Sequence, residues 1–219
     1  MDRSARGIET CSSATPNVGP IVYVVDDDIS VRESLEGLIR EAGWRALSFS
    51  SARDFLSHQH KAGPSCLILD MSLPDLNGLD LQQQIAGERA DMPIIFVTGY
   101  GDIPTSVRAM KAGAVEFLTK PFGDETLLDA IGGALKRSAT TLDAAADLQI
   151  LKDRYASLSG REREVMALIV TGLMNKQVGG ELGISEITVK AHRGRMMQKM
   201  KVRSFADLVN IAAKLGIRR

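Results

Sequence analysis

The chain has 219 residues, of which 44% are hydrophobic and 25% are charged, and its formal net charge is zero. This is the composition of an ordinary globular protein, which excludes a chain that is disordered throughout. No apolar run approaches the roughly 18 residues of a membrane helix, and no apolar stretch follows Arg3 and Arg6, so we expect a cytoplasmic protein. Cys11 and Cys66 are far apart and outside any CxxC motif, which argues against a disulfide framework or a zinc site.

The zero net charge conceals two halves of opposite sign. From Tyr155 to Arg219 the chain carries 12 Lys and Arg against 5 Asp and Glu, a net charge of +7, so residues 1–154 carry −7. An acidic front half joined to a basic back half predicts two domains with different partners. A basic domain is suited to a polyanion such as DNA, although the charge can also serve only to solvate a small helical domain.

The hydrophobic pattern predicts a leader followed by alternating strands and helices. Residues 1–19 lack periodicity, and we expect them to be disordered. Five short apolar runs are then typical of buried strands: Ile21–Val25, Trp44–Phe49, Cys66–Leu69, Pro93–Val97 and Ala114–Leu118. The amphipathic stretches predicted to be helices are Val31–Ala42, one capped by Ser51, Leu79–Glu88, one from Pro104 to Gly113, and one capped by Asp124. Five strands alternating with five helices imply an α/β domain with a doubly wound parallel sheet.

The rest of the chain is predicted to be helical. Residues 138–158 are rich in Ala, Asp and Leu without Pro or Gly, which indicates a helical linker that can continue the preceding helix. Residues 159–219 lack any strand pattern and are predicted to form four short helices. The expected capping residues are Ser159, in a capping box with Glu162, and then Asn175, Ser185 and Ser204. A turn at Gly183 separates the second and third helices, as in a helix-turn-helix.

Polar and charged residues follow the predicted strands where each strand ends: Asp26, Asp27 and Asp28, then Asp70, Thr98 and Lys120. Because the carboxyl ends of parallel strands meet at one edge of a sheet, we expect these side chains to lie close together. Carboxylates in close quarters repel each other unless a hard cation joins them, and Mg²⁺ is the natural choice. A carboxylate beside Mg²⁺ can act as a nucleophile toward a phosphoryl group, whose oxygens a lysine and a threonine can bind.

Residues 20–137 resemble the receiver domain of two-component response regulators. The strings VVDDD, LILDMSLPDLNG, VTGYGDIP and VEFLTKPF carry the resemblance. The resemblance implies the sheet order 2-1-3-4-5 and phosphorylation of Asp70. It also implies a switch in which Thr98, Phe117 and Lys120 take part, and a cis peptide bond between Lys120 and Pro121.

By the same resemblance, Mg²⁺ would be bound by the carboxylates of Asp26, Asp27 and Asp70 and by the backbone carbonyl of Ser72. Asp28 stands one residue too late for this role, and we expect it to cap the first helix. The family uses the positions of Ser72 and Tyr100 to tune the lifetime of the phosphoryl group. His58 and His60 are assigned to the second helix, far from the pocket, and are expected to be solvated.

The string LSGREREVMALIVTGLMNKQVGGELGISEITVKAHRGRMMQKM resembles the LuxR-type helix-turn-helix of the NarL/FixJ family, and TGYGDIP and KPF upstream favour its FixJ-like branch. The combined resemblance covers residues 20–215. It implies a receiver at 20–137, a linker at 138–158 and a DNA-binding domain at 159–219.

The third helix of this domain is the expected recognition helix. Its helical spacing predicts that Val189, Met196 and Met200 face the core, with Ile187 and His192 near that stripe. Lys190, Arg193 and Gly194 are then expected to face outward, where Lys190 and Arg193 would read base edges, preferably those of guanine. The residues expected to contact phosphates are Thr188, Lys176, Lys199 and Lys201.

The combined resemblance implies a response regulator in which a sensor histidine kinase phosphorylates Asp70 and thereby switches dimerisation, sequence-specific DNA binding and transcription, mostly by activation. We expect a homodimer on palindromic or repeated half-sites, RNA polymerase as a further partner, no membrane association, and no catalysis beyond the receiver's own phosphoryl transfer and autodephosphorylation. Two alternatives remain open. A Mg²⁺-dependent aspartyl-phosphate phosphatase would need a second acid where Ser72 stands, and the helical domain could bind a protein instead of DNA.

Overall fold

The structure is a computed structural model that describes residues 19–99 and 103–217. The described residues form two compact units, which are divided between Leu142 and Asp143. Apart from Gly19, the predicted leader lies outside the described residues, as do Cys11 and Tyr100. Within the described ranges, none of the helices combines the length and the apolar character needed to traverse a lipid bilayer.

The first unit is built on a parallel sheet of five strands in the order β2-β1-β3-β4-β5. The strands are β1 (Ile21–Val25), β2 (Arg45–Phe49), β3 (Ser65–Asp70), β4 (Ile94–Thr98) and β5 (Glu116–Thr119). Strands β1 and β3 are buried along their whole length, which is why β1 and the stretch Cys66–Leu69 of β3 are unbroken apolar runs. The predicted doubly wound sheet and its strand order are confirmed.

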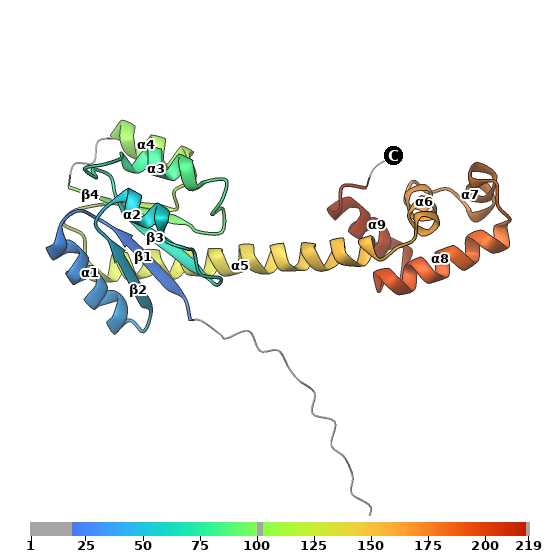
Figure 1. The fold of residues 1–219 in the computed structure, drawn as a ribbon, viewed down its shortest axis with the longest axis horizontal. Coiled ribbons are helices and arrows are strands. Elements are labelled where there is room, and N and C mark those ends of the chain that lie inside the picture. Colours follow the sequence, from blue (N-terminus) through green and yellow to red (C-terminus); the bar gives the residue numbers. More distant parts are fainter. Residues whose placement is uncertain (1–18, 100–102, 218–219) are drawn as a thin grey trace, which may run out of the picture. The chain divides into compact units, whose positions relative to one another are not determined.

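Two layers of helices cover the sheet (Figure 1). Helices α1 (Ile29–Glu41) and α5 (Asp124–Ala156) contribute to the core on one face, and α2 (Ala52–Ser57), α3 (Gly78–Ile85) and α4 (Ile103–Lys111) to the core on the other. Neighbouring residues of β1 point to opposite faces, as Tyr23 and Val24 illustrate. The sheet therefore has a hydrophobic core on each side, and Cys66 is buried in one of them, where burial raises the pKa of its thiol to about 12.

Helix α5 does not stop at the predicted end of the receiver. It begins at Asp124, which is its first residue and not its cap, and continues to Ala156 through most of the predicted linker. Ser138, predicted to be the first linker residue, is fully buried in the first unit. Its hydroxyl accepts a hydrogen bond from the N–H of Ser65 at 3.0 Å and donates one to the carbonyl of Asp91 at 2.6 Å. The domain boundaries at 137 and 158 therefore stay predictions.

The second unit packs four short helices around one core: α6 (Gly160–Ile169), α7 (Asn175–Leu182), α8 (Glu186–Met200) and α9 (Phe205–Lys214). Ser159, Ser185 and Ser204 cap α6, α8 and α9 as predicted. Asn175 does not cap α7, because the cap position belongs to Met174, whose N–H donates to Gln177 Oε1 at 2.8 Å.

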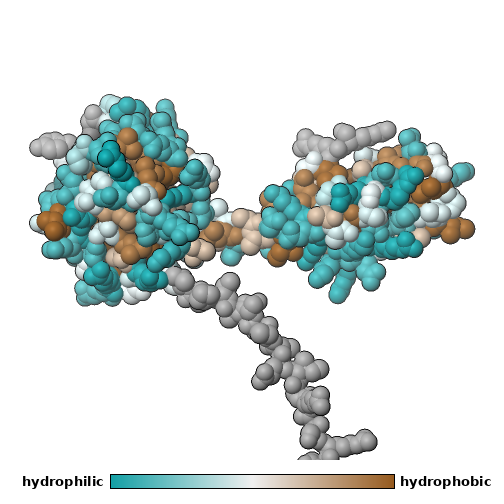
Figure 2. Space-filling model, in the orientation of Figure 1, coloured by the Kyte–Doolittle hydropathy of each residue, from teal (hydrophilic) through white to brown (hydrophobic). Residues whose placement is uncertain are grey.

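The turn between α7 and α8 needs two glycines. Gly183 has φ of 65°, a left-handed conformation that glycine adopts without steric cost. At Gly179 a Cβ atom would lie 2.7 Å from the carbonyl oxygen of Ile184, so any side chain there would force the turn open. This close approach explains Gly179 and confirms the helix-turn-helix arrangement of α7 and α8. Hydrophilic residues cover most of the visible surface of both units, with smaller hydrophobic areas among them (Figure 2).

His58 and His60 lie after α2 and are packed among aromatic rings, so the prediction that they are solvated is wrong. The ring centroid of His58 lies 5.2 Å from that of Phe49, and the centroid of His60 lies 5.8 Å from that of Tyr23. His60 Nε2 is 3.8 Å from Asp91 Oδ2. Burial lowers the pKa of His60 and outweighs the opposing effect of the Asp91 carboxylate.

We expect the first unit to lose stability as the pH falls from about 7.5 to about 5.5, because His60 binds a proton more weakly in the folded than in the unfolded state. His60→Gln removes this titration, so its urea midpoint should change less with pH than that of the wild type. Asp91→Asn removes the carboxylate that favours protonated His60 and should make the loss steeper. The single tryptophan, Trp44, lies in this unit and reports unfolding by fluorescence. Equal pH slopes for the wild type and His60→Gln would contradict the prediction.

Candidate functional site

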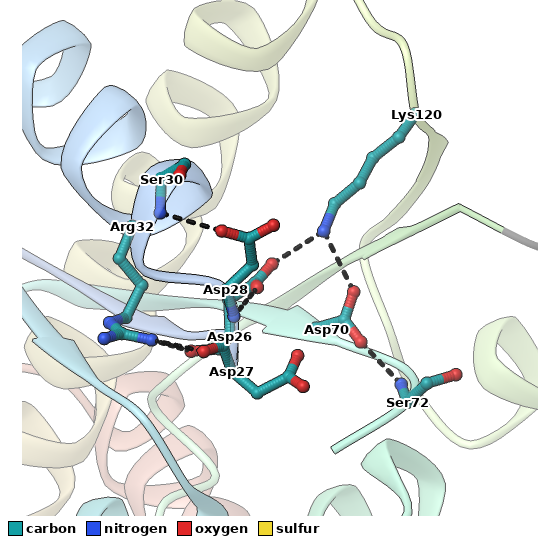
Figure 3. A network of polar contacts seen from close by, with 8 residues as sticks. All are labelled: Asp26, Asp27, Asp28, Ser30, Arg32, Asp70, Ser72 and Lys120. Atoms are coloured by element: carbon teal, nitrogen blue, oxygen red, sulfur yellow. Dashed lines mark hydrogen bonds and ion pairs between the residues drawn. The ribbon is translucent and has the colours of Figure 1, made fainter. Parts of the chain in front are cut away.

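Lys120 links two buried carboxylates at the carboxyl edge of the sheet (Figure 3). Its Nζ donates to Asp26 Oδ2 at 2.7 Å and to Asp70 Oδ1 at 3.1 Å. Asp26 and Asp70 are 1% and 6% exposed, and buried anions require such a partner. Burial by itself would lower the pKa of Lys120, but its hydrogen bonds to Asp26 and Asp70 outweigh this effect and raise it. The structure thus joins the ends of β1, β3 and β5 through one ammonium group.

The backbone after β3 holds the other oxygen of Asp70. Asp70 Oδ2 accepts a hydrogen bond from the N–H of Ser72 at 2.6 Å. Helix α3 begins against the same strand end at Gly78, where a Cβ atom would lie 2.8 Å from the Asp70 carbonyl oxygen. Gly78 therefore permits the close contact between α3 and the end of β3 beside Asp70. Sequence reasoning did not single it out, although it ends the string LPDLNG.

The residues after Asp26 have separate roles. Asp28 caps α1 as predicted, since its Oδ1 accepts a hydrogen bond from the N–H of Ser30 at 2.8 Å. Arg32, to which no sequence pattern pointed, donates from Nη1 to the carbonyl oxygens of Asp26 and Asp27 at 2.8 and 2.9 Å. Arg32 therefore fixes the turn that presents the acidic pair. Among the described residues, the exposed Asp27 carboxylate has no hydrogen-bond or ion-pair partner (Figure 3).

The predicted magnesium ligands have suitable chemistry but are not gathered into a ligand cluster. In the part of the chain that the structure describes, no group of three or more His, Cys, Asp or Glu side chains is arranged to hold a metal ion. Asp26 and Asp70 are engaged by Lys120, and Asp27 is exposed beside them. Carboxylates and a backbone carbonyl such as that of Ser72 are the hard oxygen donors that Mg²⁺ prefers, so the donor set fits this ion.

The remaining predicted pocket residues lie on β4 and β5. Thr98 ends β4 and is 1% exposed, beside the strand that ends in Asp70. Phe117 is half-buried in β5, with its ring centroid 6.3 Å from that of Phe96. The peptide bond between Lys120 and Pro121 is cis, as predicted. Thr98 thus lies at the edge of the sheet where the carboxylates are found, whereas Phe117 packs on the core beside it.

Helix α8 of the second unit has a buried face and an exposed one. Val189, Met196 and Met200 are fully buried, as the helical spacing predicted. Lys190 is exposed, and its Nζ lies 3.0 Å from Glu186 Oε1. The other exposed residues predicted to meet DNA are Thr188, Lys176, Lys199 and Lys201. This exposed, basic surface is the candidate nucleic-acid interface.

Two residues of α8 differ from their predicted orientations. Arg193 does not face outward with Lys190: it is half-buried, and its Nη1 donates to Asn175 Oδ1 at 3.2 Å. Ile187 does not lie near the core but is 80% exposed. The helical spacing explains both, because Arg193 follows the buried Val189 by four residues, and Ile187 lies on the opposite side of the helix.

Lys199 forms an ion pair inside the second unit. Its Nζ lies 2.7 Å from Glu162 Oε2 and donates to the carbonyl of Ser157 at 3.2 Å. Glu162 is 3% exposed and also accepts a hydrogen bond from the N–H of Ser159 at 2.8 Å. The Lys199 and Ser159 hydrogen bonds lower the pKa of Glu162. This network ties the end of α8 to the start of α6, a role for Lys199 that the sequence did not suggest.

Two known families match most of the chain. Residues 22–132 match the family described as "Response regulator receiver domain", and residues 156–212 match "Bacterial regulatory proteins, luxR family". The first match falls within residues 1–142 and the second within 143–219. Each unit therefore has a family of its own.

Similar proteins span both units. Nodulation protein W of Bradyrhizobium diazoefficiens is 51% identical over 197 residues, which cover 90% of this chain and 87% of the relative. Transcriptional regulatory protein FixJ of the same organism is 37% identical over 196 residues, which cover 90% of this chain and 96% of the relative. Among solved structures, the response regulator StyR aligns with a TM-score of 0.79 at 49% identity, covering 90% of this chain and 99% of StyR.

We expect Glu162→Gln to destabilise the second unit by about 1 kcal/mol, because it keeps a cap for Ser159 but removes the charge that pairs with the partly exposed Lys199. Because its pKa is lowered in the folded state, Glu162 stabilises the fold at pH values above its unfolded-state pKa of about 4.3. This contribution is lost as the pH falls through the folded-state pKa. Amide hydrogen exchange in α6 and α8 measures the effect.

The matched control is Glu164→Gln, since Glu164 forms only an exposed pair with Arg161 at 2.7 Å. It should change the free energy of opening by less than about 0.5 kcal/mol. If the two substitutions changed the free energy of opening equally, the pair of Glu162 with Lys199 would stabilise the unit no more than an exposed pair does, and the prediction would be wrong.

Proposed function

The chain belongs to the family of response regulators that join a receiver domain to a LuxR-type DNA-binding domain, and we propose that a phosphoryl group on Asp70 switches it. A sensor histidine kinase would donate this group. Phosphorylation would favour a homodimer, and the dimer would bind DNA at palindromic or repeated half-sites and, with RNA polymerase, control transcription. The relatives support this proposal, since they include proteins named as transcriptional regulators.

The observation that carries the proposal is the position of Asp70 between Lys120 Nζ and the N–H of Ser72, at 3.1 and 2.6 Å. In the transfer, a carboxylate oxygen of Asp70 forms a bond to phosphorus while the P–N bond of the donor phosphohistidine breaks. The electron pair of that bond stays on the imidazole nitrogen, which takes up a proton from solvent. Lys120 is then placed to bind a phosphoryl oxygen, and Thr98, at the neighbouring strand end, to donate a hydrogen bond to another.

Receiver domains generally use Mg²⁺, and the donor set described above is compatible with it. Asp26, Asp27, Asp70 and the backbone carbonyl of Ser72 would hold the ion, which when bound would neutralise the charge that gathers on the phosphoryl oxygens. Arg32 and Lys120 would keep the carboxylates in place for it.

The route from the pocket to DNA would begin with Lys120, because a phosphoryl group competes with Asp26 for its ammonium. Lys120 follows β5, and Phe117 lies three residues before it. A shift of the end of β5 would change how Phe117 packs. This would alter one of the two surfaces through which receivers could pair, formed either by α4 and β5 or by α1. One helical domain reads only a short half-site, so pairing two domains raises the affinity for a double site.

In the DNA-binding domain, Lys190 would contact base edges, whereas Thr188, Lys176 and Lys201 would contact phosphates. Lys199 would contact a phosphate while keeping its ion pair with Glu162. The guanidinium of Arg193 donates a hydrogen bond to Asn175. We therefore propose that Arg193 positions α7 against α8 and does not contact a base.

A phosphatase of the aspartyl-phosphate type is less well supported. Two residues after Asp70, where such an enzyme needs an acid, stands Ser72, and a LuxR-type domain has no part in that chemistry. The chain would therefore catalyse only its own phosphoryl transfer and autodephosphorylation.

We expect the wild type to take one phosphoryl group from acetyl phosphate when Mg²⁺ is present, and none when EDTA removes the ion. Asp70→Asn should take none, because an amide is not a nucleophile toward phosphorus. Lys120→Met should be labelled more slowly, because the ammonium that binds a phosphoryl oxygen is lost. Phosphate-affinity gel electrophoresis measures the product. The control Asp80→Asn, an exposed acid on α3, should behave as the wild type; labelling of Asp70→Asn at the wild-type rate would refute the site.

For DNA binding, we expect Lys190→Ala to relax the preference at one base pair of each half-site and to cost about 1–3 kcal/mol. Lys201→Asn should weaken binding to all DNA sequences alike, since it removes one phosphate contact. It should also reduce the slope of log K against log salt concentration by about one. Asparagine is chosen because Lys201 has φ of 54°, a left-handed conformation that it tolerates. Selection of operators from random duplexes, followed by salt titration, separates the two effects. An unchanged preference in Lys190→Ala would exclude it as a base contact.

A further inference from the structure

The exposed face of α8 carries a large apolar side chain. Ile187, in the first turn, is 80% exposed, while Val189 and Met196 on the opposite side are fully buried. Ala191 and Gly194 follow Ile187 at four and seven residues, so they share its face of the helix. Both are exposed, and the space that a side chain at Gly194 would occupy is open. From Ile187 to Gly194, the outward face of α8 is therefore one isoleucine followed by two small residues.

The fold itself does not account for this isoleucine. Ser185 caps α8, and Ile187 stands two residues inside the helix, where no burial holds it. In a helix-turn-helix, residues near the start of the second helix are those that reach base edges in the major groove. A side chain at the position of Ile187 would thus meet the floor of the groove, and the small residues after it would let the helix come close.

The surroundings of Ile187 favour DNA over a protein partner. Thr188, Lys190 and Arg195 are exposed on either side of this face of α8. The chain from Tyr155 onward carries a net charge of +7. A basic, narrow surface with one apolar side chain complements a polyanion better than an apolar protein surface. Among the groups that the four bases present in the major groove, the C5 methyl of thymine is the apolar one.

We propose that Ile187 recognises thymine by packing its side chain against the C5 methyl group of one thymine in each half-site. The inference rests on the proposed DNA binding of the second unit and adds the identity of a base that it reads. Residues three apart on a helix surface lie about 5–6 Å apart, and base pairs are stacked about 3.4 Å apart. The thymine is therefore expected within one or two base-pair steps of the base that Lys190 contacts.

The test uses the full chain and duplexes selected by the wild type from a random library. In the selected duplex, each thymine of one half-site is replaced in turn by deoxyuridine, which lacks only the methyl group. One replacement should weaken binding of the wild type about three- to fivefold, as expected for one buried methyl group. Ile187→Ala should bind the thymine and uracil forms of that position equally well, and Ile187→Val should keep part of the difference. Fluorescence anisotropy measures each dissociation constant.

The control is Ile150→Ala, which shortens another exposed isoleucine of the same unit, on α5, and should keep the full thymine preference. Alanine favours helix, so Ile187→Ala is expected to fold. If Ile187→Ala retains the wild-type preference for thymine over uracil, or if the wild type shows none at any position, the inference is overturned. Loss of polymerase-dependent transcription with thymine preference unchanged would instead assign Ile187 to a protein contact. Failure of the wild type to select any duplex would refute the proposed DNA binding itself.

Discussion

One ammonium group shared between two buried carboxylates is the constraint on which the receiver unit depends. Asp26 directly follows β1 and Asp70 ends β3, its neighbour in the sheet, and Lys120 reaches both from beyond β5 with contacts of 2.7 and 3.1 Å. Without Lys120, the buried carboxylates of Asp26 and Asp70 would repel each other without a neutralising cation. The ammonium group of Lys120 therefore stabilises this edge of the sheet. The proposed phosphorylation of Asp70 would add negative charge there and would redistribute the contacts of Lys120. This gives the pocket a physical means of affecting β5.

The second unit uses the same kind of device for a different purpose. The buried Glu162 carboxylate is satisfied by Lys199 and by the N–H of Ser159, and the pair connects the end of α8 to the start of α6. In the middle of α8, Arg193 donates a hydrogen bond to Asn175 on α7. Two basic residues of α8 thus hold the helix in place, which leaves Ile187 and Lys190 to define its outward surface.

The predictions made from sequence held best where a pattern repeats a local rule. Unbroken apolar runs identified the buried strands, and serine caps placed the starts of α6, α8 and α9. They failed where a side chain's surroundings come from distant segments. The sequence assigns His58 and His60 to the second helix as solvated residues, yet they lie after it, packed against the rings of Phe49 and Tyr23. Ser138 looks like a linker residue, yet its partners are Ser65 and Asp91.

The sequence by itself determined the fold class, the order of the two units, and the types of residue at the strand ends, because these follow from periodicity, caps and the geometry of parallel strands. Only the tertiary structure decided how those residues pair. That Lys120 bridges Asp26 and Asp70, that Lys199 is paired with Glu162, and that Arg193 donates a hydrogen bond to Asn175 depend on contacts across long sequence separations. Such contacts are set by packing in three dimensions, to which the spacing of residues along the chain is only an indirect guide.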